Sequence, residues 1–446
     1  MRRPSSAPDA PAIHLPLHLP EVHGLSLWSN FAWVLAGNVV YAACQLGMIV
    51  ALARLGSTFM LGQFSLGLAI ATPILMFSNL HLRAVQATDA ARRYTFQEYL
   101  RLRAATTAAA LVAIAALCHF AGYAAGTRRV ILAVAIAKGI ESISDVHYGL
   151  FQLNDRLDQT GTSMMLRGAL AVTAMVAGLY LTGQVFWGCA ALAGAWLGCL
   201  FLFDRRRGRQ FATRKPANER PRYASLIRIA LPLGLVTTMA AINLNMPRYF
   251  IHSSRGEHEL GIYSAMAYAT VAMVVFGDSL GHCSIPRMAR FYAAGQLAEF
   301  RGLLRKLLSA GAMLGLSGLL VAQLGGAKLL SLFYGPEYAV HSRAFVTLIF
   351  GAAIYCVASV FSSGITATRS FRIQVPLYAT IAGANALACL NWVPQFGLRG
   401  GAAAMVVASS VHLVLAASVL SYLLFFRKPL AGGAGAQCVP EMEARI

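Results

Sequence analysis

Stretches of about 20 apolar residues, separated by short polar segments, recur along the whole chain. A helix of that length crosses the ~30 Å hydrocarbon core of a bilayer and satisfies its own backbone hydrogen bonds there. The pattern therefore predicts an all-α polytopic membrane protein with about 12 transmembrane helices. The predicted segments are residues 29–52, 60–82, 104–125, 130–151, 167–183, 184–203, 229–251, 261–283, 306–324, 344–363, 374–392 and 400–426.

The second half of the chain echoes the first in the order of its motifs. Gly62-x-Phe64-Ser65 has a counterpart in Gly261-x-Tyr263-Ser264, 199 residues later (62 to 261), and at the same offset Asn79 corresponds to Asp278. We therefore expect two six-helix lobes related by a parallel pseudo-twofold repeat around a central polar cavity, an arrangement used by transporters. The expected parts are a disordered tail (1–27), an N-lobe (28–203), a basic linker (204–228), a C-lobe (229–426) and a second tail (427–446).

The fourth apolar segment carries three charged residues, Lys138, Glu141 and Asp145, within an arc of roughly 60° on one helix face. Each charge near the middle of a membrane helix costs roughly 2.5–3.5 kcal/mol when it is unpaired. This face must therefore line a wet interior or pack against charged partners. Neutralisation of Lys138 by one of the two carboxylates, as a structural pair, remains an alternative.

Polar residues also lie inside three other apolar segments. Together with the charged fourth segment, this makes two polar-containing helices in each half of the chain. A central cavity between the lobes is the simplest arrangement that satisfies all of them. Simpler roles stay open: an interface anchor for Arg54 or Arg248, and local or interhelical hydrogen bonds for the others. The residues are Asn38, Tyr41 and Gln45 in the first segment, Asn243, Asn245 and Arg248 in the seventh, and Asp278 and His282 in the eighth.

The composition agrees with a membrane protein: 57% of residues are hydrophobic, 12% are charged and the mean hydropathy is +0.60. The net charge of +20 comes mainly from one side, since about 28 of the 37 Lys and Arg residues fall in tails and loops that would face the cytoplasm. This bias predicts that both termini are cytoplasmic, and it makes a nucleic-acid partner unexpected. The eight cysteines are scattered without metal-ligand spacing, and no nucleophile–base pair or phosphate-binding loop occurs. We therefore expect no metal, no cofactor and no enzymatic activity.

Several short motifs resemble the bacterial polysaccharide (O-antigen type) flippases of the multidrug/oligosaccharidyl-lipid/polysaccharide exporter (MOP) superfamily. They span most of the chain in the order of that family. The motifs are Ala53-Arg54-Leu55-Gly56 with Gly62-Gln63-Phe64; Leu80-x-Leu82-Arg83 with Asp89 and Tyr99-x-x-x-Arg103; Gly261-Ile262-Tyr263-Ser264; Tyr334-Gly335-Pro336-Glu337-Tyr338; and Gly397-Leu398-Arg399-Gly400-Gly401-Ala402.

The resemblance implies that the protein moves a polyprenyl-diphosphate-linked oligosaccharide, an O-antigen or exopolysaccharide repeat unit, from the cytoplasmic to the periplasmic face of the bacterial inner membrane by alternating access. Its partners would then be this lipid-linked substrate, membrane lipid and enzymes of glycan assembly. Cations are expected to bind the diphosphate and amides the sugar, while acidic groups and a histidine would couple transport to an ion. The candidates are Lys138, Arg248 and Arg54 for the diphosphate; Asn38, Gln45, Asn243 and Asn245 for the sugar; and Glu141, Asp145, Asp278 and His282 for coupling.

Two other functions remain open from the sequence. A cation-coupled drug antiporter of the same superfamily would favour an acidic cavity, which Glu141 and Asp145 allow but Lys138 and Arg248 disfavour. A membrane polysaccharide polymerase or ligase would need sizeable outer loops, and the longest one expected here, about residues 325–343, is short.

Overall fold

The computed structural model describes residues 27–89, 92–211, 223–368, 370 and 373–425. Within these ranges the chain is helical and contains no strand, which confirms the predicted all-α class. The predicted tails lie outside the described residues except at position 27, and so do residues 212–222 of the predicted linker and residue 426 of the predicted C-lobe. Of the described parts of that linker, residues 204–208 and 223–228 belong to helices and residues 209–211 form a turn.

The first half of the chain forms six long helical segments. The third of them begins earlier than the apolar pattern indicated because Thr95 and Glu98 form a capping box, in which each side chain accepts a hydrogen bond from the other residue's backbone N–H. The elements are α1 (Leu27–Leu55), α2 (Thr58–Asn79), α3 (Leu82–Ala87), α4 (Phe96–Phe120), α5 (Ala125–Leu153), α6 (Leu157–Thr182), α7 (Val185–Cys199), the π-helical turn η1 (Leu200–Asp204) and α8 (Arg205–Gly208).

The second half starts with α9 (Tyr223–Ala293), which consists of two helices joined at Gly256. This residue has φ 78° and ψ −173°, a backbone conformation that glycine adopts readily and other residues rarely do. The chain therefore reverses direction there, between residues 223–255 and 257–293. Five further elements follow: α10 (Leu297–Phe333), α11 (Pro336–Ala339), α12 (Ser342–Ala367), α13 (Gln374–Phe396) and α14 (Leu398–Phe425).

Each of the twelve predicted apolar segments overlaps one of these helices, or one half of α9, over most of its length. The largest differences are at residues 80–82 and 121–125, which were predicted as membrane-spanning but lie beyond the ends of α2 and α4. In the described part of the chain, nine helices are long and apolar enough to cross a membrane. One of the nine contains both halves of α9, and α5 and α13 are not counted among them. α5 carries Lys138, Glu141 and Asp145, which lower its hydropathy. The protein is therefore a multi-pass membrane protein.

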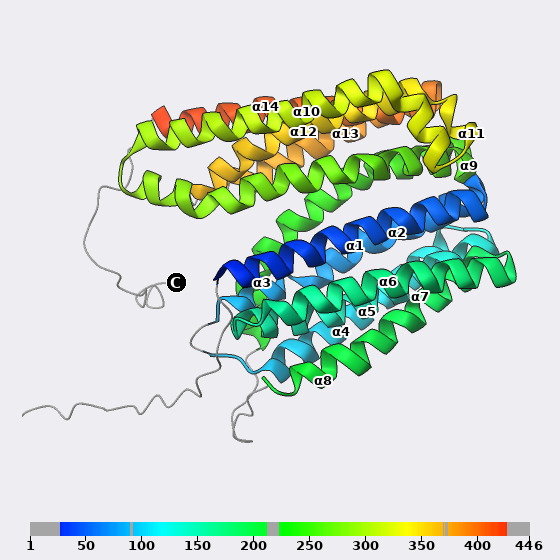
Figure 1. Ribbon diagram of the computed structural model, residues 1–446, viewed down its shortest axis with the longest axis horizontal. Helices are drawn as coiled ribbons and strands as arrows, with labels where there is room; N and C mark the ends of the chain where they lie inside the picture. The colour runs from blue at the N-terminus through cyan, green and yellow to red at the C-terminus, as the bar shows by residue number, and fades with distance from the viewer. Residues whose placement is uncertain (1–26, 90–91, 212–222, 369, 371–372, 426–446) are drawn as a thin grey trace, which may run out of the picture.

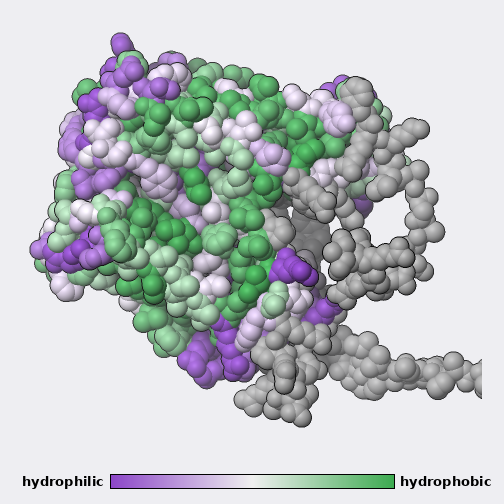
Figure 2. Space-filling model, turned by 180° about the vertical axis from the view of Figure 1, so that it is seen from behind, coloured by the Kyte–Doolittle hydropathy of each residue, from purple (hydrophilic) through white to green (hydrophobic). Residues whose placement is uncertain are grey.

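The helices group into two lobes, α1–α8 and α9–α14 (Figure 1). The lobes meet mainly where α2 packs against α9, with smaller contacts from α1 and α3 to α9. α1 begins and α14 ends at one end of the bundle, which we call the terminal end; the opposite end, where α1 ends and α2 begins, is the far end. In Figure 1 the terminal end is at the left. Hydrophilic residues gather at both ends and hydrophobic residues cover the middle, as expected for a bilayer-spanning surface (Figure 2).

Hydrophobic packing differs between the two ends. One cluster of buried residues includes members of both lobes, from Ile49 and Phe64 to Tyr263 and Phe345. A second cluster, around Phe300, lies in the C-lobe alone. A third joins the N-lobe only to the first turns of α9, through residues 226 and 230. Toward the terminal end, buried hydrophobic contact between the lobes is therefore limited to the first turns of α9.

Candidate functional site

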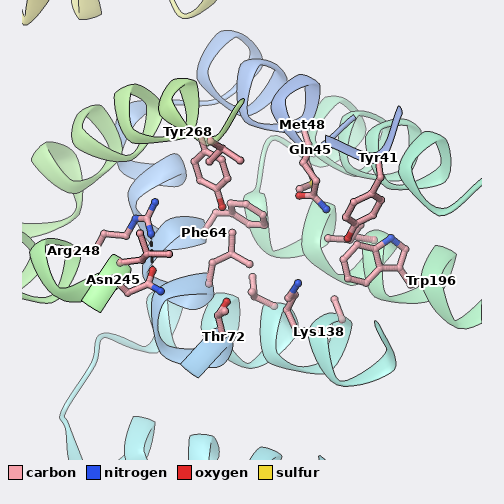
Figure 3. Close-up of a pocket in the computed structure, with 16 residues that line it drawn as sticks. Tyr41, Gln45, Met48, Phe64, Thr72, Lys138, Trp196, Asn245, Arg248 and Tyr268 are labelled. Atoms are coloured by element: carbon pink, nitrogen blue, oxygen red, sulfur yellow. Dashed lines mark hydrogen bonds between the residues drawn. The ribbon is translucent and has the colours of Figure 1, made fainter. Parts of the chain in front are cut away.

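A cavity of about 260 Å³ lies between the two lobes. Its walls come from α1, α2, α5 and α7 of the N-lobe and from both halves of α9 (Figure 3). Four of the seven residues predicted to bind substrate line it: Gln45, Lys138, Asn245 and Arg248. The other lining residues are Tyr41, Met48, Phe64, Leu68, Thr72, Val134, Ala137, Leu192, Trp196, Leu244, Tyr268 and Val271.

The C-lobe wall presents Arg248. Its Nη1 donates a hydrogen bond to Asn245 Oδ1 at 2.5 Å, and its guanidinium lies 5.6 Å from the centre of the Tyr268 ring. The Arg248 Nε is buried without a hydrogen-bond partner, and no carboxylate of the described residues forms an ion pair with this side chain. Arg248 therefore contributes a positive charge to the cavity that the described part of the chain does not neutralise.

The N-lobe wall presents Lys138 on the opposite side of the cavity (Figure 3). Lys138 forms an ion pair with Glu141, one helical turn away on α5. Glu141 also accepts a hydrogen bond of 2.5 Å from the Tyr41 hydroxyl of α1. The Lys138 ammonium lies 5.9 Å from the centre of the Trp196 ring. The sequence left open whether Lys138 lines a cavity or forms a structural ion pair. In the structure it does both.

A buried ion pair contacts the N-lobe wall on the side away from the cavity. Arg167 of α6 and Asp204 of η1 are 3.1 Å apart, and their side chains are 2% and 0% exposed. Ser163 donates a further hydrogen bond of 2.6 Å to Asp204. The Arg167 guanidinium also lies 5.8 Å from the Trp196 ring centre, so the pair fixes an aromatic side chain of the cavity wall.

Asp145 does not share the environment of Lys138, although the helical pattern placed them on one face. It forms ion pairs with Arg83 at 3.4 Å and with Arg103 at 3.3 Å. The Arg103 side chain is fully buried. Asp145 therefore connects α5 to α3 and α4 and does not line the cavity.

Three further substrate-binding candidates lie outside the cavity. Asn38 is exposed and donates to the carbonyl of Val34 in its own helix. Asn243 accepts a hydrogen bond of 2.9 Å from the buried Asn385 of α13.

Arg54 lies at the far end. It donates to backbone carbonyls of Ser331, Leu332 and Phe333, at the end of α10. Its role in the structure is thus to join the two lobes.

Of the remaining coupling candidates, Asp278 accepts a hydrogen bond from the Tyr355 hydroxyl at 3.3 Å. It is in the second half of α9, away from the residues that line the cavity. The side chain of His282 lies outside the described residues. No group of three or more His, Cys, Asp or Glu residues in the described ranges has a geometry that could hold a metal ion.

No model of a known protein family matches the chain. It is 24% identical to the capsular polysaccharide biosynthesis protein CapF of Staphylococcus aureus over 404 residues, which cover 90% of this chain and 99% of that protein. Among solved structures, the lipid II flippase MurJ in an inward closed conformation aligns with a TM-score of 0.66 at 10% identity, over 88% of this chain and 87% of MurJ. An inward-facing multidrug resistance MATE family transporter of the MOP superfamily aligns with a TM-score of 0.59 at 14% identity, over 91% and 97%. The chain therefore shares its fold with these two transporters.

The resemblance found in the sequence is therefore confirmed. Within this fold, the sequence located the cavity residues of α1, α5 and α9 but did not indicate that Arg103, Arg167 and Asp204 are buried. A signal was present for Arg167: the fifth predicted segment, residues 167–183, is shorter than the ~20 residues that a span requires. The helix begins at Leu157, which brings Arg167 into the bundle.

Proposed function

We propose that this protein is a flippase that moves a polyprenyl-diphosphate-linked oligosaccharide across the bacterial inner membrane by alternating access. The termini would be cytoplasmic and the far end periplasmic, as the distribution of Lys and Arg indicates. The similarity to a capsular polysaccharide biosynthesis protein and the fold shared with a lipid II flippase support this class of substrate.

The observation that carries the proposal is Arg248 in the cavity without a carboxylate partner among the described residues. An unneutralised guanidinium in a site bounded by apolar side chains is costly unless an anion binds it. A diphosphate accepts paired hydrogen bonds from this planar group. Arg248 is therefore the principal diphosphate ligand in our proposal, and Lys138, already paired with Glu141, takes a secondary part.

The size of the cavity defines how much of the substrate it encloses. At about 260 Å³ it falls below the ~300–1,000 Å³ of typical pockets for small molecules. In the proposed mechanism the cavity would hold the diphosphate and the sugar next to it, while the polyprenyl tail would remain in lipid. Gln45, Asn245 and the aromatic rings of Tyr41 and Trp196 would contact this sugar.

The test is an analysis of lipid-linked saccharides in a deletion strain, complemented with wild type, Arg248→Ala or Arg255→Ala. Arg255 is the matched control, since it lies on the same helix but donates to the carbonyl of Pro394 outside the cavity. We expect a complete lipid-linked repeat unit to accumulate on the cytoplasmic face and wild type and Arg255→Ala to relieve it. Loss of charge-assisted hydrogen bonds worth about 1.5–3 kcal/mol predicts roughly 10- to 100-fold weaker binding for Arg248→Ala. Absence of accumulation in the deletion strain would refute the proposal.

The second candidate is a cation-coupled drug antiporter of the same superfamily. Glu141, beside the cavity, and the fold shared with MATE transporters favour it. Increased sensitivity of the deletion strain to cationic drugs, with unchanged surface glycan, would support this alternative.

A further inference from the structure

We propose that the crossing of α2 with the second half of α9 is the outer gate of this transporter, and that Glu257 holds it closed. The inference rests on the proposed alternating access, because it identifies the contacts that must break before the cavity opens at the far end. Three independent contacts between the lobes meet in this region: a pair of glycines, a polar bridge and an arginine anchor.

The glycine contact is reciprocal. A Cβ atom on Gly62 would lie 1.9 Å from the backbone carbonyl oxygen of Glu257, and one on Gly261 would lie 1.9 Å from that of Thr58. Gly62 therefore contacts the carbonyl that lies one helical turn before Gly261, and Gly261 contacts the carbonyl that lies one helical turn before Gly62. The two pairs are related by the same offset of 199 residues (58 to 257 and 62 to 261) that relates the two halves of the sequence. The pseudo-twofold axis thus passes through this crossing.

This geometry makes the crossing either fully closed or open. Helix backbones approach so closely only where both lack side chains, and the contact energy comes from many short-range atom pairs and from Cα–H···O contacts. Such contacts are lost within a small separation of the helices. Rotation of one lobe against the other would therefore disengage Gly62 and Gly261 together.

A polar bridge crosses the same interface. Thr127, at the start of α5, donates a hydrogen bond of 3.1 Å to Glu257 Oε1 and accepts one of 2.9 Å from Gln63 of α2. Thr127 and Gln63 are buried. On the C-lobe side, His252 Nε2 is 3.6 Å from the same Glu257 oxygen. The Glu257 carboxylate therefore joins the first half of α9 to the N-lobe helices α2 and α5.

The arginine anchor completes the closure. Arg54, at the end of α1, donates to three carbonyls at the end of α10. The Ser331 carbonyl also accepts a hydrogen bond from the backbone N–H of Gly335. All three carbonyls belong to the last turn of α10 and carry the partial negative charge of the helix C-terminus, which stabilises a cation there. All three contacts lie at the far end, whereas toward the terminal end the buried hydrophobic contact between the lobes is limited to the first turns of α9. The structure is thus closed at the proposed periplasmic side.

The first experiment crosslinks the gate in purified protein, in a chain whose eight cysteines are replaced. Thr127→Cys/Glu257→Cys joins the two lobes, and Gln63→Cys/Thr127→Cys joins two helices of the N-lobe as the matched control. Each pair is treated with a short bifunctional thiol reagent and reconstituted in vesicles. Each crosslinked protein is compared with the same double variant before crosslinking. We expect the interlobe crosslink to reduce translocation of a polyprenyl-diphosphate-linked saccharide at least about tenfold, reversibly with reductant, and the control crosslink to leave the rate of its own double variant unchanged. Full translocation by the interlobe crosslinked protein would overturn the proposal.

The second experiment reports on the gate without any substrate. Thr72→Cys lines the cavity, and its labelling by a membrane-impermeant thiol reagent from the far end measures opening. In this background Gly62→Ala places a methyl group against the Glu257 carbonyl, whereas Gly194→Ala on α7 adds a methyl group in open space. We expect Gly62→Ala to raise the labelling rate at least about tenfold and Gly194→Ala to leave it unchanged. Equal labelling rates in the two variants would refute the gate.

The two experiments separate this inference from the proposed function. If the protein moves no lipid-linked saccharide but labelling at Thr72→Cys still depends on Gly62, the gate stands and the substrate assignment falls. If translocation occurs, the interlobe crosslink does not reduce it and Gly62→Ala does not change the labelling rate, the flippase function stands and the gate is elsewhere.

Discussion

The buried ion pair between Arg167 and Asp204 provides the most direct test of how the N-lobe is stabilised. Replacing Asp204 with alanine leaves a guanidinium that is 2% exposed without its carboxylate partner, and it also removes the acceptor of the Ser163 hydroxyl. Replacing Arg167 with methionine leaves a carboxylate that is 0% exposed. Replacing both, with Met at 167 and Leu at 204, removes both charges and keeps most of the volume.

The expected magnitudes differ between the single and double variants. Removing one partner of a buried pair costs about 3–5 kcal/mol, because a charge stays buried without compensation. Replacing both partners with apolar residues of similar volume is often nearly neutral. For a domain of 150–250 residues, each kcal/mol lowers the midpoint of thermal unfolding, Tm, by roughly 2–4 °C. Each single variant should thus lose about 6–20 °C, and the double variant much less.

The assay is thermal unfolding of purified protein in detergent at one fixed scan rate, since membrane proteins of this size unfold irreversibly and Tm then depends on the rate. Arg205→Ala is the matched control, because this neighbour of Asp204 on α8 is exposed, stacks on the Phe201 ring and forms no ion pair with any of the described residues. A loss of less than about 2 °C in Asp204→Ala, or a double variant that loses the sum of both singles, would refute the reasoning.

Three further predictions follow from the cavity and its surroundings. Glu141→Gln frees Lys138 from its carboxylate and should tighten binding of a short-chain prenyl diphosphate about tenfold by calorimetry, whereas Lys138→Ala should weaken it by a similar factor; unchanged affinity in both would remove Lys138 from the site. Arg54→Ala removes the anchor on α10 and should raise labelling of Thr72→Cys from the far end about fivefold, as expected for roughly 1 kcal/mol. Arg129→Ala is the control, because Arg129 is exposed and donates to the carbonyl of Ala125 in its own helix; equal effects of both substitutions would contradict the anchor. Asn385→Ala leaves Asn243 without its donor and should cost about 1–3 kcal/mol of stability while the substrate concentration at half-maximal transport stays the same; a selective rise in that concentration would place Asn243 in the substrate path.

The sequence by itself determined the class of the protein and the position of its helices. Each membrane span needs about 20 apolar residues, a constraint so strong that the twelve segments could be located from hydrophobicity alone. The repeat was also detectable, and Gly62 and Gly261, identified by their shared motif, meet at the pseudo-twofold axis. Four cavity residues were found because a polar side chain inside an apolar helix must face the interior.

Only the tertiary structure decided which polar groups meet. Helical periodicity placed Lys138 and Asp145 on one face, yet Asp145 pairs with Arg103, whose position inside the bundle depends on how α4 packs. Asn243 and Asn245 are two residues apart, but one contacts α13 and the other lines the cavity. The rotation of each helix relative to its neighbours is determined by packing between residues far apart in the chain. That rotation, which no local pattern contains, separates the cavity from the ion pairs that support it.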